Sequence, residues 1–288
     1  MRWKKGETSQ DIEDRRGASG GRKFPGGAKG AGIAGVVVLL VGMFLGVDVS
    51  KLVGGGSDGG GEEAKETPVA EDSDTERRLV KFVSFVLDDA QATWKKKFRE
   101  MGKTYERTKL VLYRQGTETA GCGYGKSAIG PFYCPADKKV YLDFSFFNVM
   151  KQRLGADGEF AQAYVLAHEV AHHVQNLLGA SGRVRAEKRG KSKIQKNRLS
   201  VKLELQADCY AGIWANATAK RGVVESGDID KAIRAAKAIG DDTLQKNAGR
   251  QVREESFTHG SAAQRVKWFK RGQSSGNIKR CDTFAELR

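Results

Sequence analysis

The chain has 288 residues, enough for one sizeable domain or two small ones, and 39% hydrophobic with 30% charged residues is typical of a globular protein with solvated segments. Its formal net charge of +15 attracts anionic partners without identifying them. The sequence has no nucleic-acid motif, and its most basic stretch has no interleaved aromatic residues, so specific nucleic-acid binding is not expected.

The chain begins with a basic segment that is followed by an uncharged, apolar run. Residues 1–29 hold eight Lys or Arg against four acids, and Gly30–Val47 has no charged side chain. Such a run is near the lower limit for a helix that crosses a bilayer. A cleaved signal peptide would need an unusually long basic region, and no clean small-x-small cleavage site follows. We therefore predict a single-pass transmembrane anchor at 30–49, with the N-terminus cytoplasmic and the remainder outside.

An acidic, glycine-rich stretch separates this anchor from the folded part of the chain. Residues 50–74 have little to bury and are predicted to be a flexible linker. The folded domain should therefore span residues 75–288 as one unit.

Four cysteines fit an extracytoplasmic location, because disulfides form in oxidising compartments. They lack the CxxC pairs that are typical of metal sites, and they allow three pairings. We favour Cys122 with Cys134 and Cys209 with Cys281, since the first pair brackets a short glycine-rich excursion. In a cytoplasmic chain the same residues would be four reduced thiols.

Hydrophobic periodicity predicts an α+β domain with two strands and several helices. A first helix opens at an N-cap, Asp74 or Thr75, and carries Val80, Val83 and Trp94 at helical spacing. The predicted strands are Leu110–Tyr113 and Lys138–Phe147. Later helices are predicted over Glu159–Leu178, over Leu199–Ala219, from Asp228 to before Gly240, and from Ser261.

A strongly basic run lies between two of these helices. Arg183–Lys202 holds nine Lys or Arg against the single acid Glu187. The run fits an electrostatic contact with anionic lipid or with an envelope polyanion. A solvated, mobile loop is the interpretation we favour.

Three of the four histidines stand in "AHEVAHHVQ", residues 167–175. His168 and His172 are four residues apart, so on a helix both imidazoles lie on one face and can reach one metal ion. Glu169 can reach a water on that ion, which completes an HExxH motif. Histidines that face solvent or pack in a core have the same spacing. His173 lies about 100° round the helix from His172, so packing, or a supporting role behind the ligands, is expected rather than ligation.

A second predicted helix offers the remaining metal ligand. A catalytic zinc takes a third protein ligand and keeps one position open for water. In "LELQADCYAG", Glu204 and Asp208 are again four residues apart. Glu204 is the candidate third ligand, and Asp208 can accept the proton of a ligand imidazole and fix its tautomer. We therefore predict one catalytic Zn²⁺ ion.

Four stretches resemble the bacterial neutral zinc metallopeptidase family, whose members are membrane-anchored: "HEVAHHVQNLLG", "LELQADCYAGIWA", "GPFYCPADKKVYLDFSFF" and "ESFTHGSAAQRVKWF". The similarity extends from "MRWKKGETSQDIEDRRG" to "CDTF". It implies a zincin-like domain, with a small sheet packed on the HExxH helix, behind a single N-terminal transmembrane helix in a bacterial cell membrane. It also implies His168, His172 and Glu204 as zinc ligands, Glu169 as the catalytic residue and Asp208 behind the ligands. The basic run Arg183–Lys202, between the two helices that carry the ligands, departs from the family pattern. The resemblance therefore does not define how a substrate reaches the site.

Hydrolysis of a peptide bond at such a site needs a base and a donor for the oxyanion. Glu169 would take the proton of the attacking water, so its loss should abolish turnover and leave zinc bound. His259, beside a glycine and just before a helix, is our candidate donor, although a surface or capping histidine fits equally. Arg265 and Tyr210 are further candidates for the site. A peptide or protein substrate would pair with an edge strand of the sheet that contains "KKVYLDFSFF".

Two other classes of protein compete with a membrane-anchored zinc endopeptidase. The first is a catalytically inactive, zinc-containing envelope scaffold that binds through its basic surface. Glu169 argues against it, whereas Cys209 could close a structural zinc site unless it is bonded to Cys281. The second is a deformylase-like amidase, whose "EGCxS"-like cysteine context is absent around Cys122 and Cys134.

Overall fold

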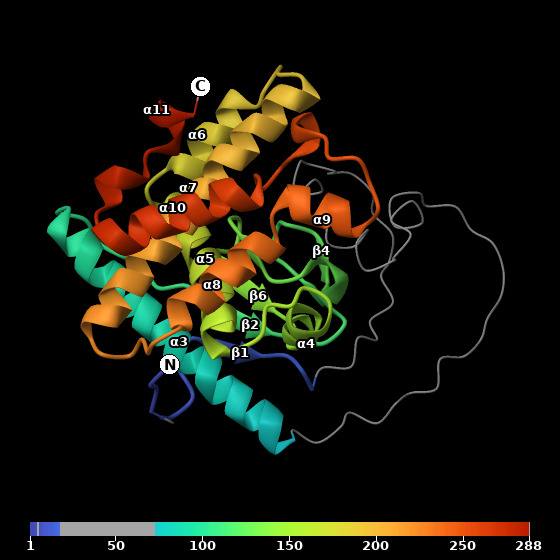
Figure 1. Ribbon diagram of the computed structural model, residues 1–288. Coiled ribbons are helices and arrows are strands. Elements are labelled where there is room, and N and C mark those ends of the chain that lie inside the picture. The colour runs from blue at the N-terminus through green and yellow to red at the C-terminus, as the bar shows by residue number, and fades with distance from the viewer. Residues whose placement is uncertain (5, 18–72, 288) are drawn as a thin grey trace, which may run out of the picture.

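The structure is a computed structural model that describes residues 1–4, 6–17 and 73–287 (Figure 1). The predicted anchor at 30–49 and all but the last two residues of the predicted linker at 50–74 lie outside this part of the chain. Within the described ranges, no helix combines the length and the apolar character needed to cross a membrane.

Helices dominate the described fold, which is of the α+β class. The first long helix, α3 (Asp74–Glu100), begins one residue after Ser73, whose hydroxyl accepts the backbone N–H of Glu76. The cap therefore precedes the two predicted positions. The later α-helices are α4 (Ser145–Gln152), α5 (Glu159–Leu177), α6 (Ala180–Glu187), α7 (Lys193–Lys220), α8 (Asp228–Ala238), α9 (Asp241–Asn247), α10 (Ala262–Ser275) and α11 (Thr283–Glu286).

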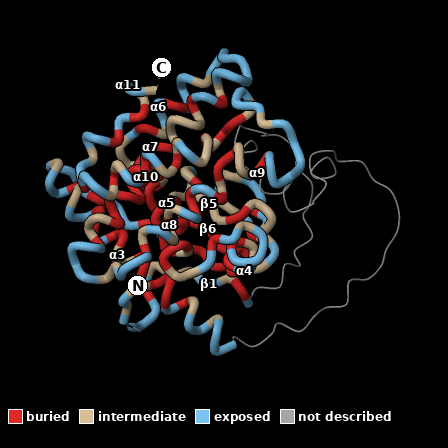
Figure 2. Tube along the Cα trace, viewed as in Figure 1, coloured by how far each residue is buried: buried red, intermediate tan, exposed pale blue. Residues whose placement is uncertain are grey.

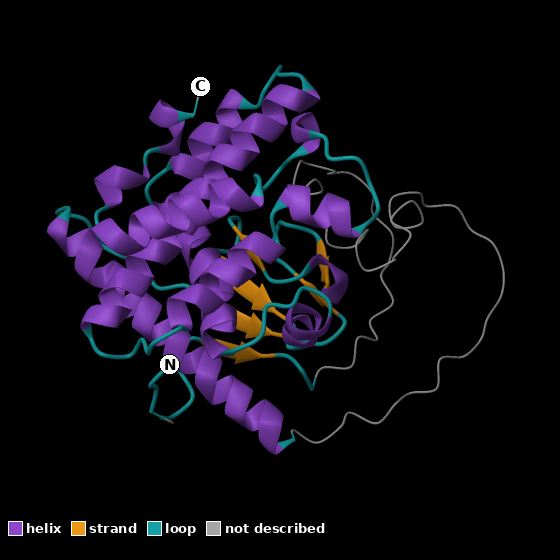
Figure 3. Cartoon of the chain, in the orientation of Figure 1, coloured by secondary structure: helices purple, strands orange, loops and turns teal. Residues whose placement is uncertain are grey.

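A four-stranded sheet lies to one side of the helices (Figure 3). Its strands, in spatial order, are β1 (Ile12–Asp14), β2 (Lys109–Leu112), β6 (Lys139–Leu142) and β5 (Phe132–Cys134). β1, β2 and β6 are parallel, and β5 is antiparallel to β6. A separate ribbon pairs β3 (Gly116–Glu118) with β4 (Tyr124–Lys126).

The second predicted strand is shorter than expected. β6 ends at Leu142, Phe144 is the N-cap of the next helix, and Phe146 and Phe147 belong to α4. Asp143 causes the change of direction, because its carboxylate accepts the backbone N–H of Ser145. β6 also lies between β2 and β5, so the terminal strand beside it is β5.

The N-terminal segment is part of the same folded body, which corrects the predicted boundary at residue 75. Ile12 of β1 is opposite Leu110 of β2, and Ser9 donates a hydrogen bond of 2.9 Å to Asp88 on α3. A three-residue strand with a single apolar side chain gives no periodic signal, so the pattern could not predict it. A bilayer cannot pass between paired strands. This pairing and a single membrane crossing between residues 17 and 73 therefore exclude each other in one molecule.

The basic run is helical, which corrects the expectation of a mobile loop. It contains most of α6, a short turn and the first turns of α7. Ser192 and Gln195 form a capping box that begins α7 six residues before the predicted start. Asn197 and Leu199 are buried there, while most of the Lys and Arg residues face solvent. The proposed contact with anionic lipid or polyanion stays a prediction.

Buried residues concentrate around α5, which packs against α3, α7 and the strands β5 and β6, and along the contact of α7 with α10 (Figure 2). Two disulfides fasten the periphery to this core. Cys122 is bonded to Cys134 of β5, and Cys209 of α7 is bonded to Cys281, the pairing favoured from sequence. The sequence separation of the second pair is 72 residues, so it ties the C-terminal end to the helix that carries Glu204.

Candidate metal centre

The packing of α5 against α7 brings three candidate ligands together. The distance from His168 Nε2 to Glu204 Oε2 is 3.1 Å, and that from His172 Nε2 to the same oxygen is 3.5 Å. The ligand atoms of the three residues all lie within 4.8 Å of one another. Both histidines come from one face of α5, because their spacing is close to one helical turn.

The other nitrogen of each histidine is held by a side chain behind it. His168 Nδ1 donates to Asp208 Oδ1 at 2.9 Å, and His172 Nδ1 donates to Gln175 Oε1 at 2.9 Å. Gln175 is itself fixed, because its amide group donates to the carbonyl of Leu203 at 2.7 Å. With both Nδ1 atoms protonated, both Nε2 lone pairs face the cluster.

Gln175 was missed by sequence reasoning, although it closes the stretch "AHEVAHHVQ". It stands three residues after His172, and residues at that spacing are neighbours on a helix. This spacing is the signal that could have identified it.

The donor set fits a zinc ion. Two imidazoles and one carboxylate are ligands typical of catalytic zinc, and its usual bond lengths of about 2.0–2.2 Å place neighbouring tetrahedral ligands about 3.3–3.5 Å apart. The two distances to Glu204 Oε2 lie close to that spacing. Three electron-pair acceptors that converge in a buried place require a cation or protons between them.

A buried ionic network supports His168 from behind. Arg265 on α10 donates through Nε to Asp208 Oδ2 at 2.9 Å and through Nη2 to Oδ1 at 3.0 Å. The Tyr164 hydroxyl donates to Oδ1 at 2.5 Å. Burial acts to raise the pKa of Asp208, but the charges of Arg265 and His168 outweigh it and lower that pKa. Asp208 therefore stays anionic, and Arg265 acts through it rather than at the ligand cluster.

Glu169 lies beside the ligands without being one of them. Its side chain is buried, with 8% of the residue exposed, on the helix that carries both histidines. Burial raises the pKa of Glu169, and the charges of His172 and His168 oppose this shift without reversing it. A buried carboxylate of raised basicity has the chemistry of a proton acceptor.

His259 lies on the loop before α10, against α7. A Cβ atom added at the next residue, Gly260, would meet Leu205 Cδ2 at 3.1 Å and Val201 Cγ1 at 3.3 Å. Those residues flank Glu204 on its helix, and the negative charge of Glu204 acts to raise the pKa of His259. The loop therefore adjoins the ligand cluster.

Two other predicted candidates lie apart from the cluster. His173 is fully buried, and its Nε2 donates to the carbonyl of Glu106 at 2.7 Å. Tyr210 packs its ring against Trp94 with centroids 5.2 Å apart. Cys209 is held in its disulfide, so its sulfur is not available as a fourth ligand.

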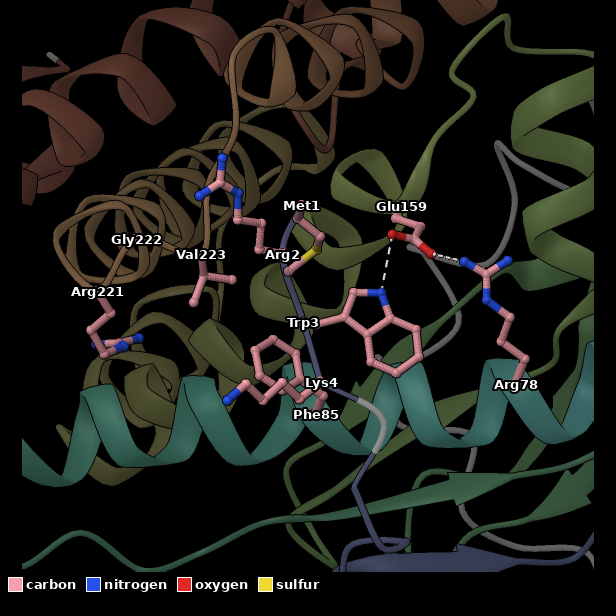
Figure 4. A pocket seen from close by; sticks show the side chains of 10 residues that line it. All are labelled: Met1, Arg2, Trp3, Lys4, Arg78, Phe85, Glu159, Arg221, Gly222 and Val223. Carbon is pink, nitrogen blue, oxygen red and sulfur yellow. Dashed lines mark hydrogen bonds and ion pairs between the residues drawn. The ribbon is translucent and has the colours of Figure 1, made fainter.

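A cavity of about 730 Å³ lies elsewhere, where the N-terminal residues cover α3 and the end of α7 (Figure 4). Trp3 donates to Glu159 at 3.1 Å, and Arg78 pairs with the same carboxylate at 2.6 Å. None of the candidate ligands lines this cavity. Residues 1–4 supply four of its ten lining residues, so the docked N-terminus forms one side of this cavity.

Comparisons with known proteins cover nearly the whole chain. A family model described as "Putative neutral zinc metallopeptidase" matches residues 1–284. The chain is 46% identical to "Uncharacterized protein YpfJ" of Escherichia coli (strain K12) over 298 aligned residues, which cover 99% of both chains. It is 44% identical to "Uncharacterized protein Rv2575" of Mycobacterium tuberculosis over 192 residues, or 63% of this chain and 64% of that relative. No solved structure matches the chain.

Proposed function

The chain belongs to the neutral zinc metallopeptidase family, and from that premise we propose that it is a zinc endopeptidase that hydrolyses peptide or protein substrates. The observation that carries the proposal is the convergence of His168, His172 and Glu204, with Glu169 beside them and not among them. A purely structural zinc site would have no use for this additional buried carboxylate.

In this proposal the zinc ion is held by the three converging side chains. When bound, zinc lowers the pKa of a water ligand and polarises the scissile carbonyl. Asp208 and Gln175 hold the two imidazoles with their Nδ1 protons directed away from the cluster. This arrangement keeps both ligands in the tautomer that binds a metal.

Glu169 performs the proton transfers. Its carboxylate accepts a proton from the attacking water and later delivers it to the leaving amine, so no net proton is consumed at this residue. The negative charge that develops on the carbonyl oxygen is stabilised by a donor, for which we propose His259.

The substrate would bind as an extended strand beside β5. This strand ends the sheet, and its Tyr133 hydroxyl is hydrogen-bonded to His173 on the HExxH helix at 3.0 Å. Main-chain hydrogen bonds to a sheet edge hold a peptide irrespective of its sequence. Together with the zincin-like arrangement implied by the family resemblance, this contact makes β5 the proposed docking edge.

We further propose that the domain is extracytoplasmic, which its two disulfides support. Attachment to a bacterial membrane through Gly30–Val47 stays a prediction. A single crossing by this segment would place β1 and β2 on opposite sides of the membrane. Attachment of this kind therefore requires that β1 does not pair with β2 in the membrane-inserted protein.

The first experiment measures zinc content and hydrolysis of unfolded casein by the full-length protein and its Glu169→Gln variant. The full chain is used because residues 1–17 pack on the domain. We expect equal, stoichiometric zinc in both proteins and cleavage by the parent alone. The loss of turnover should exceed about 100-fold, because a positioned general base contributes at least that much.

A His172→Gln variant provides the matched comparison, because it removes a ligand and should lose zinc and activity together. Zinc without chelator-sensitive cleavage by the parent on a broad substrate panel would favour the inactive scaffold. An absence of zinc in the parent would contradict both functions.

A further inference from the structure

Asp241, the first residue of α9, is fully buried and binds the whole loop that carries His259. Its Oδ2 accepts the backbone N–H groups of Thr258, His259 and Gly260 at 2.7, 2.7 and 2.9 Å. Its Oδ1 lies 3.1 Å from His259 Nδ1. The backbone N–H of Asp241 also donates to the carbonyl of Gly260 at 2.9 Å.

This geometry fixes both the ring and its proton. A carboxylate accepts hydrogen bonds and cannot donate them, so His259 Nδ1 must carry a proton to bond Asp241. Thr258 Oγ1, at 3.1 Å from the same nitrogen, can accept or donate and does not alter this requirement. Within the described part of the chain, no hydrogen bond involves Nε2. That nitrogen is therefore left for a ligand.

Three charged groups act on this imidazole from three helices. Asp241 of α9 and Glu204 of α7 favour its protonated form, and Arg265 of α10 opposes it. Burial acts to lower the pKa of His259, but the hydrogen bond and charge of Asp241, with the charge of Glu204, outweigh burial and raise that pKa. An imidazolium held in this way donates from Nε2.

We propose that Asp241 is a positioning residue for the peptidase reaction: it orients His259 and fixes a proton on its Nδ1, so that the imidazolium form of the ring donates from Nε2 to the oxyanion of the substrate. This inference rests on the proposed function. Asp241 itself touches neither the candidate ligands nor the substrate. The same carboxylate binds the loop backbone and the ring, so one residue fixes both the position of the loop and the orientation of the imidazole.

The first test reads the His259 ring directly and does not depend on activity. The full-length zinc-loaded protein is labelled with ¹⁵N in histidine, and its four imidazoles are titrated by NMR, with assignment by a His259→Gln variant. In Asp241→Asn the pKa of His259 should fall by about 1–3 units, the usual effect of removing an adjacent opposite charge. The control is Asp242→Asn, which alters the neighbouring carboxylate that caps α10 at the N–H of Ala262 and should leave His259 unchanged.

The parent protein alone can overturn the proposal, even if the Asp241 variant fails to fold. Above the pKa of His259, the neutral ring should carry its proton on Nδ1. A neutral ring with its proton on Nε2, or equal pKa values in the parent and a folded Asp241→Asn, would contradict the assignment.

Kinetics on unfolded casein then separate positioning from simple stability. Asp241→Asn should lower kcat about 10- to 100-fold with KM nearly unchanged, and the alkaline limb of its pH profile should move to lower pH. Added to His259→Gln, the same substitution should cost no further activity. Additive losses, or an unshifted pH profile, would show a structural role only. A parent without any cleavage would contradict the proposed function, while the NMR result would stand separately.

Discussion

Two adjacent histidines on α5 have different partners and therefore different roles. His172 turns toward Glu204, whereas His173 lies in the protein interior between Tyr133 and the carbonyl of Glu106. A carbonyl only accepts, so Nε2 of His173 carries the proton and Nδ1 accepts from the Tyr133 hydroxyl. The ring is therefore neutral in the folded protein. Burial lowers the pKa of His173, and the hydrogen bond to Glu106 opposes this shift without reversing it.

The neutral state of His173 predicts a pH dependence of stability. Between the lowered folded pKa and the ordinary value of about 6.5, the unfolded chain binds more protons at this residue than the folded chain. The contribution of His173 to the free energy of unfolding should therefore fall as pH drops from 7.5 to 5.5. The fall can reach about 1.4 kcal/mol for each pH unit that separates the folded pKa of His173 from its ordinary value.

Urea denaturation of zinc-free parent and His173→Gln at both pH values measures this contribution. Between pH 7.5 and 5.5 the parent should lose free energy of unfolding relative to the variant, whatever the absolute stability of either, because the other titrating groups are common to both proteins. The same pH dependence in both proteins would mean that His173 titrates normally in the folded state.

At the scale of whole elements, α7 and α10 touch through their backbones. A Cβ atom added at Gly272 would lie 1.8 Å from the carbonyl oxygen of Cys209, and one added at Gly212 would lie 2.1 Å from that of Phe269. No side chain can adjust to relieve such contacts, because the groups it would meet belong to the opposite backbone. This approach allows Arg265 of α10 to reach Asp208 of α7.

Gly272→Ala should therefore separate the two helices. We expect a loss of stability of about 1–3 kcal/mol or more and a weaker affinity for zinc, because Arg265 would move away from Asp208. Thermal unfolding and competition with a chelator measure the two effects. Gly182→Ala is the matched control: its added Cβ meets nothing within 4 Å on α6, so stability should rise by about 0.5–1 kcal/mol. A Gly272→Ala protein as stable as this control would show that the helices can shift without cost.

At the scale of the whole molecule, local patterns and distant contacts were predictable to different degrees. The long helices and the two short-range pairs, His168 with His172 and Glu204 with Asp208, follow from spacing on one helix each. The hydrogen bond of Asp241 to His259 joins residues that no periodic pattern connects. The three-residue strands are too short to show alternation, and β1 is separated from β2 by nearly a hundred residues.

The docking of β1 yields a prediction about membrane topology. Residues 12–14 pair with 110–112 in one sheet, and Lys139 of β6 forms an ion pair of 2.6 Å with Glu13 of β1. Strands that share a sheet must lie on the same side of any bilayer. We therefore expect the N-terminal segment and the domain to be equally accessible in intact cells. The single-pass arrangement predicted from the apolar run requires opposite accessibility.

Two exposed positions, Glu7 and Arg185, allow a direct comparison. All four native cysteines are held in disulfides, so a cysteine introduced at either place supplies the reactive thiol. Glu7→Cys and Arg185→Cys should react alike with a membrane-impermeant maleimide, both labelled if the domain is extracytoplasmic. Labelling of the Arg185→Cys protein alone in intact cells, with both labelled after lysis, would show that a membrane separates the two sites. In that event β1 could not pair with β2 in the membrane-inserted protein, and the edge of β2 that β1 covers here would be open to another strand.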